Sequence, residues 1–493
     1  MQFLQLYIIA ATWLPLLVGL VAAAPVDLRT VFSGANWFVN TTIAYPGSAY
    51  FEDSTERWTI FDPPTYSAVV RPGTEADVVQ VIQLAGSHKI PFLATGGRHG
   101  FGTTLGRLDE GLAIDLSGFD SVQVDADVAT ATVGGGATFA DIYEPIFAAG
   151  YEIQTGSCSC PGVLGVTLGG GIGRYQSLHG LIIDALVSVR LVTASGEIVT
   201  ASQTSNPELF WGIRGAGTNF GIVTSATYKL SPLTNSGLSL TADFVFPVGM
   251  TEAFFHVLAV FSGETIPGLS AITLFVYDEE TSSPQILTNW VYAGPEDEGR
   301  RILEPLFALN PPFANATMVP WNRLVYEAGF GLDAAFCTGP AVRSIYTASM
   351  RKLSADTYQA AFEKLSAFWE DVPQARRSTI ELELLGEPVA GAIPDADTAY
   401  PWRDAVAYTM FQMTWTDATV AGQANALARE LRDDFAATSG YDGLATYVSY
   451  AHGDEPITAI YGERKLTRLA ALKNRWDPDN VFGFYNALPR QYA

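Results

Sequence analysis

The sequence is poor in cysteine, in histidine and in basic residues, and each shortage argues against a class of protein. Three cysteines in 493 residues cannot form the disulfide framework of a small secreted scaffold. The five histidines show no metal-ligand spacing with one another or with the cysteines, so no metal site is expected. With 28 Lys and Arg against 51 Asp and Glu, the net charge of −23 repels phosphate backbones, and no nucleic-acid partner is expected.

Two enzyme signatures are also missing. No Gly-x-Ser-x-Gly elbow of a serine hydrolase is present. A dinucleotide fingerprint beginning at Gly169 or Gly171 would need a third glycine where Arg174 or Gln176 stands, so a Rossmann domain is not expected. A content of 48% hydrophobic, 12% aromatic and 16% charged residues is instead typical of a compact globular protein with a sizeable core.

Residues 1–24 are predicted to be a signal peptide, which makes the protein secreted. Residues 7–26 carry no charge, include a proline at Pro15 and contain three alanines ending at Ala24, a pattern that signal peptidase cuts. A membrane anchor is the alternative, because the run approaches spanning length. The proline and the alanine-rich end favour cleavage, so no stable anchor is expected. The sequons at Asn40 and Asn315 agree with secretion and predict glycosylation.

The periodicity of apolar residues divides the chain into two regions of different character. Residues 94–173 hold 18 of the 46 glycines, among short strands and helices. From about residue 240 the glycines thin out and longer alternating segments predict a sheet backed by helices. Strands are expected at 68–72, 90–95, 186–192, 222–230, 272–277, 379–384 and 405–415. Helices are expected at 75–89, 356–369, 421–436 and 466–476.

Three glycine-rich loops suggest a cofactor with a pyrophosphate. They comprise residues 95–100, 134–136 and 156–173. Glycine lets backbone N–H groups approach a pyrophosphate without a Cβ in the way. A tight turn explains any one of these loops equally well. Three loops within about 80 residues, two of them carrying a reactive side chain in His99 or Cys158, favour the cofactor.

The sequence resembles the berberine-bridge-enzyme-like flavoproteins of the vanillyl-alcohol-oxidase superfamily, especially the secreted fungal members. The resemblance extends from about Phe61 to the C-terminus. It rests on Ala68-Val69-Val70-Arg71-Pro72, Thr95-Gly96-Gly97-Arg98-His99, Gly156-Ser157-Cys158 before Leu168-Gly169-Gly170-Gly171, Leu209-Phe210-Trp211 with Arg214-Gly215, Asn219-Phe220-Gly221, and Trp476-Asp477-Pro478-Asp479-Asn480-Val481-Phe482.

The resemblance implies an α+β fold with a PCMH-type FAD-binding domain of two subdomains and a substrate domain. An N-terminal segment, 25–60, precedes the FAD-binding domain at 61–235. The substrate domain, 236–440, is expected to contain an antiparallel sheet backed by helices. A C-terminal berberine-bridge-like segment, 441–493, returns to the FAD domain.

The resemblance also implies FAD bound through two covalent bonds, from His99 to the 8α-methyl group and from Cys158 to C6 of the isoalloxazine. Cys160 offers a second thiol beside Cys158. Cys160 and Cys337 are expected to be structural, and their pairing requires Cα atoms within about 7 Å, which the sequence does not give. The other residues expected to contact the cofactor are Thr95, Gly96, Gly97, Arg98, Gly100, Gly165, Gly169, Gly170, Gly171, Gly173, Gly221, Ile222, Tyr485 and Asn486.

Tyr450 is the expected catalytic base, because Tyr447-Val448-Ser449-Tyr450 resembles the family pattern Tyr-x-Asn-Tyr. A free tyrosine has a pKa of about 10, so it would need help from a charge or a hydrogen bond. Gln412 is the second catalytic candidate, on an expected substrate-domain strand. Glu381 and Glu383 alternate on another strand and could be paired carboxylates, although two acids on the same face at a sheet edge are more often solvated.

The expected function is that of a secreted FAD-linked oxidase that moves a hydride from a C–H of a small secondary metabolite to flavin N5. An alkaloid, a polyketide and an aromatic or allylic alcohol fit this class. Val166, eight positions after Cys158, corresponds in the family to the position beside which oxygen reacts, and its small side chain favours O₂ as acceptor and H₂O₂ as product. A carbohydrate oxidase is the alternative, and a flavin-loaded binding protein is the non-enzymatic one.

Overall fold

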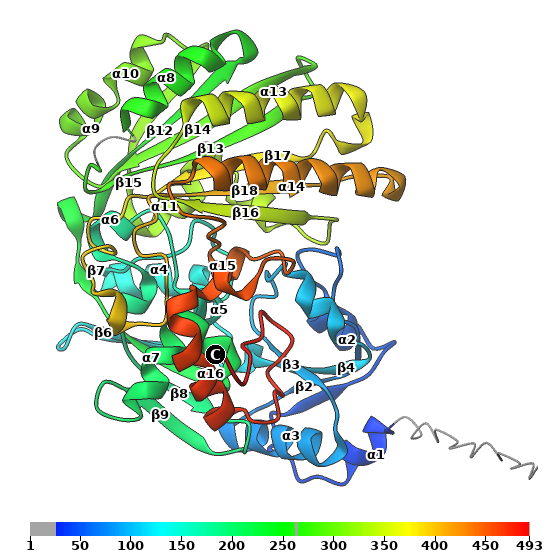
Figure 1. The fold of residues 1–493 in the computed structure, drawn as a ribbon. Helices are drawn as coiled ribbons and strands as arrows, with labels where there is room; N and C mark the ends of the chain where they lie inside the picture. Colours follow the sequence, from blue (N-terminus) through cyan, green and yellow to red (C-terminus); the bar gives the residue numbers. More distant parts are fainter. Residues whose placement is uncertain (1–25, 262–264, 493) are drawn as a thin grey trace, which may run out of the picture. The chain divides into compact units, whose positions relative to one another are not determined.

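The structure is a computed structural model, and it describes residues 26–261 and 265–492. The predicted signal peptide lies outside the described residues. The chain forms two units, Met1–Ala35 and Asn36–Ala493. The first contributes helix α1 (Leu28–Ser33), which begins where the Asp27 carboxylate accepts a hydrogen bond from the N–H of Arg29. The second unit contains the four sheets of the described part of the chain (Figure 1).

The first sheet of the larger unit has four strands, and its core is parallel. Strands β2, β4 and β3 pair in parallel, and β1 adds an antiparallel edge. Helix α3 connects β2 to β3; it begins with a capping box between Thr74 and Asp77 and buries Val78, Val81 and Ile82. The bounds are β1 Thr42–Ala44, α2 Ala49–Thr55, β2 Tyr66–Arg71, α3 Glu75–His88, β3 Phe92–Thr95 and β4 Gly111–Asp115.

The second sheet has five antiparallel strands in the order β5-β6-β10-β8-β9. A short pair, β7 with β11, lies apart from it. The strands are β5 Val122–Asp125, β6 Thr130–Gly134, β7 Tyr151–Glu152, β8 Leu186–Val192, β9 Ile198–Ser202, β10 Ile222–Lys229 and β11 Ser231–Pro232. The helices of this region are α4 Phe139–Ala148, α5 Val163–Gly169, α6 Gln176–His179 and α7 Pro207–Ala216.

The third large sheet has seven antiparallel strands in the order β15-β12-β14-β13-β17-β18-β16. Its strands are β12 Leu238–Pro247, β13 Leu269–Asp278, β14 Ser283–Tyr292, β15 Phe313–Pro320, β16 Ser344–Met350, β17 Thr379–Leu384 and β18 Ala407–Met413. The helices that accompany it are α8 Thr251–Phe261, α9 Glu296–Ile302, α10 Glu304–Ala308, α11 Trp321–Glu327, α12 Asp333–Cys337, α13 Ala355–Asp371 and α14 Ala421–Thr438.

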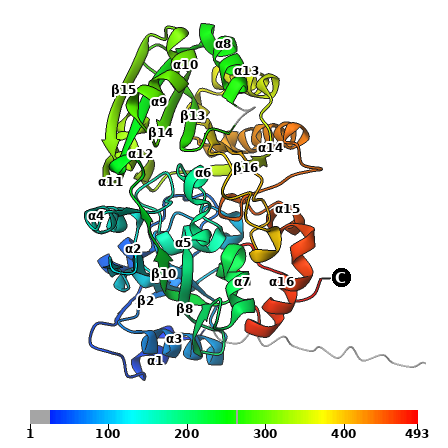
Figure 2. The same ribbon diagram turned by 90° about the vertical axis from the view of Figure 1, so that its left-hand side faces the viewer.

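Helices α8, α13 and α14 cover one face of the seven-stranded sheet (Figures 1 and 2). Strand side chains alternate between faces, so Ile380 and Leu382 of β17 join the core beneath these helices. The intervening Glu381 and Glu383 therefore face the other side. Because β17 lies between β13 and β18, the expectation of acids at a sheet edge is wrong.

The C-terminal segment packs against the glycine-rich half of the chain. Helices α15 (Ile457–Tyr461) and α16 (Glu463–Trp476) follow one another, and α16 contacts α7, beside which it lies in Figure 2. The fully buried ammonium of Lys473 donates to the carboxylate of Asp477 at 2.7 Å and to the carbonyl of Asn219 at 3.1 Å. The bond to Asn219 connects the end of α16 to the segment before β10.

The α+β fold, with an antiparallel sheet backed by helices, is confirmed. Each expected strand and helix is present, with its bounds displaced by a few residues at most. The domain boundaries stay a prediction. Among the described residues, no helix combines the length and the apolar character that crossing a bilayer requires.

Candidate active site

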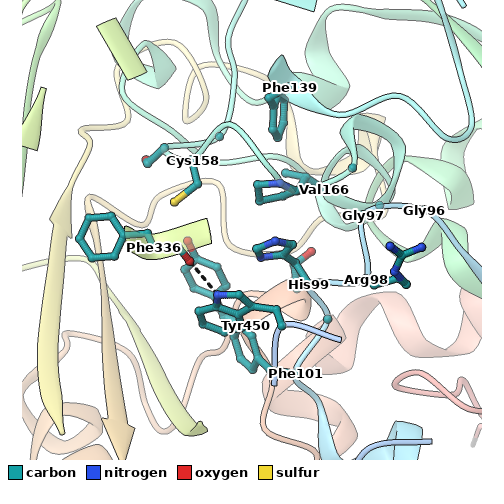
Figure 3. Close-up of a pocket in the computed structure, with 18 of the residues that line it drawn as sticks. Gly96, Gly97, Arg98, His99, Phe101, Phe139, Cys158, Val166, Phe336 and Tyr450 are labelled. Atoms are coloured by element: carbon teal, nitrogen blue, oxygen red, sulfur yellow. Dashed lines mark hydrogen bonds between the residues drawn. The ribbon is translucent and has the colours of Figure 1, made fainter. Parts of the chain in front are cut away.

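A cavity of about 570 Å³ lies between the glycine loops and the open face of the seven-stranded sheet. Its size is that of a ligand site. His99, Cys158 and Tyr450 reach it from three separate segments of the chain (Figure 3). The cavity is also lined by Thr95, Gly96, Gly97, Arg98, Gly100, Gly165, Val166, Gly221, Ile222, Gln412 and Tyr485, all of which the sequence singled out.

His99 is held as a neutral imidazole. Its ring stacks on Trp58, with centroids 5.4 Å apart and planes 23° from parallel. Burial lowers the pKa of His99 to about 4, and the nearby guanidinium groups of Arg343, Arg57 and Arg98 lower it further in the same direction. A neutral imidazole keeps a nitrogen lone pair at neutral pH, which a bond to carbon requires.

Cys158 is the free cysteine, because Cys160 and Cys337 form a disulfide with Cα atoms 5.8 Å apart. Their disulfide joins α12 to the loop around Cys158, residues 156–160, which we call the cysteine loop. Burial, followed by the charges of Glu381, Asp333 and Glu383, raises the pKa of the Cys158 thiol. The side chain is therefore protonated at neutral pH.

The first glycine loop forms a cradle of unpaired donors after β3. Within the described residues, the main-chain N–H groups of Gly97, Arg98, His99 and Gly100 have no hydrogen-bond acceptor. Arg98 has a φ of 58°, a left-handed conformation of the kind found in anion-binding nests, and the loop lines the cavity. A Cβ on Gly97 would lie 2.4 Å from the N atom of Gly162, so only glycine allows this approach.

Unpaired N–H groups that face a cavity are the donors that a pyrophosphate uses, and they fit FAD. A nest of this kind binds an anion through backbone dipoles, independently of side-chain charge. The fit explains how a protein with a large negative net charge can hold a dinucleotide diphosphate. It also explains the glycine density that the sequence shows in this loop.

Five expected cofactor contacts do not line the cavity. A Cβ on Gly169, Gly170, Gly171 or Gly173 would meet Ser449, Tyr400, Ile182 or Thr155, respectively, within 3 Å. These glycines are thus explained by the close packing of α5 and the following turn against other parts of the chain. The side chain of Asn486 is also buried away from the cavity and donates to the carbonyl of Val448 at 3.0 Å.

The polar end of the cavity contains a tyrosine bonded to a buried carboxylate. Tyr450 Oη donates to Glu383 Oε2 at 3.0 Å, and Ser157 Oγ donates to Glu383 Oε1 at 3.3 Å. Burial raises the pKa of Tyr450 well above its usual value, and the charges of Glu383 and Glu381 raise it further. Burial also raises the pKa of Glu383. A carboxylate of raised pKa is a stronger proton acceptor than a solvated one.

Glu381 and Arg174 lie beside this pair. Burial and the neighbouring Glu383 raise the pKa of Glu381 to about 8. Burial lowers the pKa of Arg174 to about 10, although Glu383, Asp243 and Glu381 raise it. Glu381 and Glu383 do not lie at a sheet edge: strand alternation directs both into the cavity from a central strand, as the paired-carboxylate alternative requires. Arg174 Nη1 has no hydrogen-bond partner among the described residues.

Gln412 lies on β18 opposite Thr379 of β17 and lines the cavity with Met410. Its amide thus belongs to the same sheet face as Glu381 and Glu383. Val166 lines the cavity from α5, one residue after Gly165. Each of these positions agrees with the role expected for the residue, which stays a prediction.

Sequence reasoning did not assign three residues of this site: Glu383, Arg174 and Asp333. Glu383 alternates with apolar residues, which is equally typical of a solvated edge and of a cavity wall. Asp333 accepts from the N–H of Ser159 at 2.9 Å and from its Oγ at 2.6 Å, across 174 positions of sequence. A contact of that sequence separation leaves no local pattern that could have predicted it.

Comparison with known proteins supports the same cofactor. The model of the FAD binding domain family matches residues 66–202, and that of the berberine and berberine-like family matches residues 446–489. The FAD-linked oxidoreductase srdI of Neurospora crassa is 47% identical, covering 94% of this chain and 93% of its own. The FAD-linked oxidoreductase fogF of Aspergillus ruber is 48% identical, covering 95% and 96%.

The fold has solved counterparts at lower identity. The glucooligosaccharide oxidase of Acremonium strictum, solved to define the roles of its 6-S-cysteinyl, 8α-N1-histidyl FAD, is 20% identical with a TM-score of 0.80, covering 94% of this chain and 99% of that one. At this identity the likeness shows the PCMH-type fold. The close relatives, which match nearly the whole chain, show the family. The chain is an FAD-dependent oxidoreductase of the berberine-bridge-enzyme-like family.

Proposed function

We propose that the protein is a secreted oxidase that takes a hydride from an alcohol carbon of a small apolar metabolite and passes the electrons to O₂. The observation that carries the proposal is the Tyr450–Glu383 hydrogen bond in the cavity that also holds His99 and Cys158. An oxidase needs a hydride acceptor and a base on opposite sides of one substrate carbon. FAD, when bound, supplies the acceptor.

Tyr450 acts as the base, with Glu383 as its proton acceptor. As the substrate hydroxyl loses its proton to Tyr450 Oη, the phenolic proton of Tyr450 moves to Glu383 Oε2. The tyrosine is therefore never required to be a free phenolate, which its raised pKa would make costly. Ser157 holds the other carboxylate oxygen and so orients Glu383. The carboxylate supplies the assistance that a tyrosine base needs.

The wall of the cavity favours a metabolite over a sugar. The sheet face presents apolar side chains, and carbohydrate recognition would instead require many hydrogen-bonding groups. The polar side chains of this face that line the cavity are Asn289, Thr379, Glu381, Glu383 and Gln412. The apolar members of the wall are Ile272, Leu274, Val276, Leu287, Ile345 and Met410. Carbohydrate oxidation is the second proposal, because the Acremonium neighbour is a glucooligosaccharide oxidase.

The proposed attachment of FAD is bicovalent, through His99 and Cys158. Both side chains reach one cavity, and the Acremonium neighbour carries a cysteinyl and histidyl FAD. Acid precipitation of the purified protein tests the proposal: the yellow colour stays with the wild-type pellet and with His99→Ala or Cys158→Ala alone. The double variant releases FAD into the supernatant. If the wild-type protein also releases its FAD, the flavin is not covalently attached, although the protein can still be an FAD enzyme.

Secretion and the use of O₂ complete the proposal. Asn40 and Asn315 are exposed, as glycosylation requires. Val166 lines the cavity with a side chain smaller than leucine, which leaves room for O₂. A hydrogen peroxide assay of the secreted protein against metabolite and sugar panels tests the activity. If the flavin is reduced without peroxide formation but passes electrons to a quinone dye, the protein is a dehydrogenase; if no substrate bleaches the flavin, it is a binding protein.

A further inference from the structure

Helix α12 contacts the surroundings of both proposed attachment residues, although it contributes neither of them. Its first residue, Asp333, is bonded to the cysteine loop, and its last residue, Cys337, is disulfide-bonded to the same loop. Its fourth residue, Phe336, offers its main-chain carbonyl to Trp58, the residue that stacks on His99. These five residues thus contact the cysteine loop directly and the His99 loop through Trp58.

Helix α12 contacts the cysteine loop through two hydrogen bonds and a disulfide. Both carboxylate oxygens of Asp333 accept from Ser159, at 2.9 Å from its N–H and 2.6 Å from its hydroxyl. Asp333 and Ser159 are 8% and 7% exposed, so these bonds are shielded from water. Ser157, on the other side of Cys158, is bonded to Glu383. Of the four residues 157–160, only Cys158 lacks an anchor, and its thiol is left to the cavity.

The contact with His99 runs through Trp58. The indole Nε1–H donates to the carbonyl of Phe336 at 2.7 Å, and the ring stacks on His99. The guanidinium of Arg343 lies 4.1 Å from the ring centroid of Trp58. Trp58 is thereby fixed at its edge by α12 and at its face by a cation, and it fixes the plane of the imidazole. Figure 3 shows Phe336, His99 and Cys158 around the same cavity, which all three line.

We propose that α12 is a brace that holds Cys158 and His99 at the spacing of one flavin ring, with Asp333 as the positioning residue for Cys158 and Trp58 for His99. The inference rests on the bicovalent attachment proposed above. In each attachment the S–H or N–H hydrogen of the side chain and one C–H hydrogen of the flavin are lost, one S–C or N–C bond forms, and O₂ takes the two electrons and two protons as H₂O₂. Each bond can form only if the sulfur of Cys158 or the ring nitrogen of His99 lies close to its flavin carbon. The brace sets these distances before either bond forms.

Two variants separate the two arms of the brace. Asp333→Asn keeps the size of the side chain but leaves one acceptor oxygen where the carboxylate offers two to Ser159. We expect at least a threefold fall in the fraction of Cys158 that carries flavin, with attachment at His99 retained. Trp58→Phe keeps a ring beside His99 but loses the donor to Phe336. We expect the fraction of His99 that carries flavin to fall, with attachment at Cys158 retained. Ser159→Ala is a milder version of the first change.

The readout is the mass of the flavin-bearing peptides from digested holoprotein, with attachment at each residue quantified separately. Thr338→Ala, an exposed change just beyond α12, is the matched control and should leave both fractions unchanged. Equal attachment at Cys158 in wild type, Asp333→Asn and Ser159→Ala, with all three folded by circular dichroism, overturns the brace. Absence of flavin at Cys158 in the wild-type protein overturns both the bicovalent proposal and the brace, so the two failures are distinguishable.

Discussion

At the scale of single residues, the chemistry of the site depends on where burial leaves each proton. The imidazole of His99 is neutral and the thiol of Cys158 is protonated, while Glu381 and Glu383 lie next to each other on one face of β17, in a cavity that Arg174 also lines. Two carboxylates beside one guanidinium hold a proton between them more readily than two ions. The pair is therefore both a proton acceptor and a cost to the folded state.

Replacing Tyr450 by phenylalanine tests the base. The ring and its packing stay, but the hydroxyl that donates to Glu383 is lost. We expect flavin reduction to slow by a factor of about 10²–10⁴ with little change in substrate binding, because a proton acceptor acts mainly in the transition state. Rapid mixing under anaerobic conditions measures the bleaching rate. An unchanged rate would make Tyr450 a packing residue.

The pH dependence of stability tests the buried acid pair. The folded protein holds the Glu381 proton up to a pH of about 8, whereas an unfolded chain loses it near its ordinary value of 4.5. Between these values the folded state binds more protons, so this pair makes the free energy of unfolding fall as the pH rises. The fall is about 1.4 kcal/mol for each unit of pKa difference.

Glu381→Gln should remove most of that dependence. Thermal unfolding of the wild-type and variant holoproteins at pH 5, 6, 7 and 8 gives the comparison. We expect the variant to gain stability relative to wild type as the pH rises. Two curves that stay parallel over this range would show that Glu381 is ionised in the folded protein, and the raised pKa would be wrong.

Residue spacing predicted the reactive side chains, but not their partners. His99 and Cys158 stand within local patterns, and both reach the cavity. The role of Glu383 depends on β17 being central in its sheet. That place is set by pairing with β18, the next strand, and with β13, which lies far earlier in the sequence. Alternation along one strand shows on which face of the sheet a side chain lies, but not what packs against that face.

At the scale of elements, the loop after β3 shows why glycine is required at particular points. Gly97 allows the cradle to lie against Gly162, whereas a Cβ would come within 2.4 Å of a backbone atom. We expect Gly97→Ala to lower the FAD content of the purified protein at least several-fold and to lower its melting temperature. The ratio of flavin absorbance to protein measures the first effect.

Gly86→Ala provides the matched control for this loop. Gly86 lies in α3, and a Cβ there meets no atom within 4 Å. Alanine in a helix restricts the unfolded chain more than glycine does, so the control should be neutral or more stable by about 0.5–1 kcal/mol. Similar losses of FAD in both variants would show that the close approach at Gly97 is not what the cradle needs.

Element type was predictable where the apolar period was long. The strand at Thr379–Leu384 and the helices Ala355–Asp371 and Ala421–Thr438 follow their sequence patterns closely. The glycine triplet at 169–171 was not predictable in the same way. Its glycines could equally have faced a cofactor or another part of the chain, and the sequence contains no sign of the Ser449, Tyr400 and Ile182 atoms that they accommodate.

At the scale of the whole molecule, the glycine-rich half and the seven-stranded half share one site, and the disulfide crosslinks them beside it. Cys160 lies in the loop that carries the free thiol, and Cys337 ends α12, which is separated from it by 177 positions. A crosslink over so long a loop removes much of the conformational freedom of the unfolded chain. It therefore contributes to stability far beyond the two residues that form it.

Replacing Cys160 and Cys337 together by serine tests this contribution. Both residues are changed so that no new free thiol competes with Cys158. We expect the free energy of unfolding to fall by about 2–5 kcal/mol, because the unfolded chain regains the freedom of the closed loop. Denaturant unfolding of wild type and double variant, each secreted under the same conditions, gives the difference. A difference below about 0.5 kcal/mol would mean that the unfolded chain gains little freedom when the crosslink is removed, and the loop-closure explanation would be wrong.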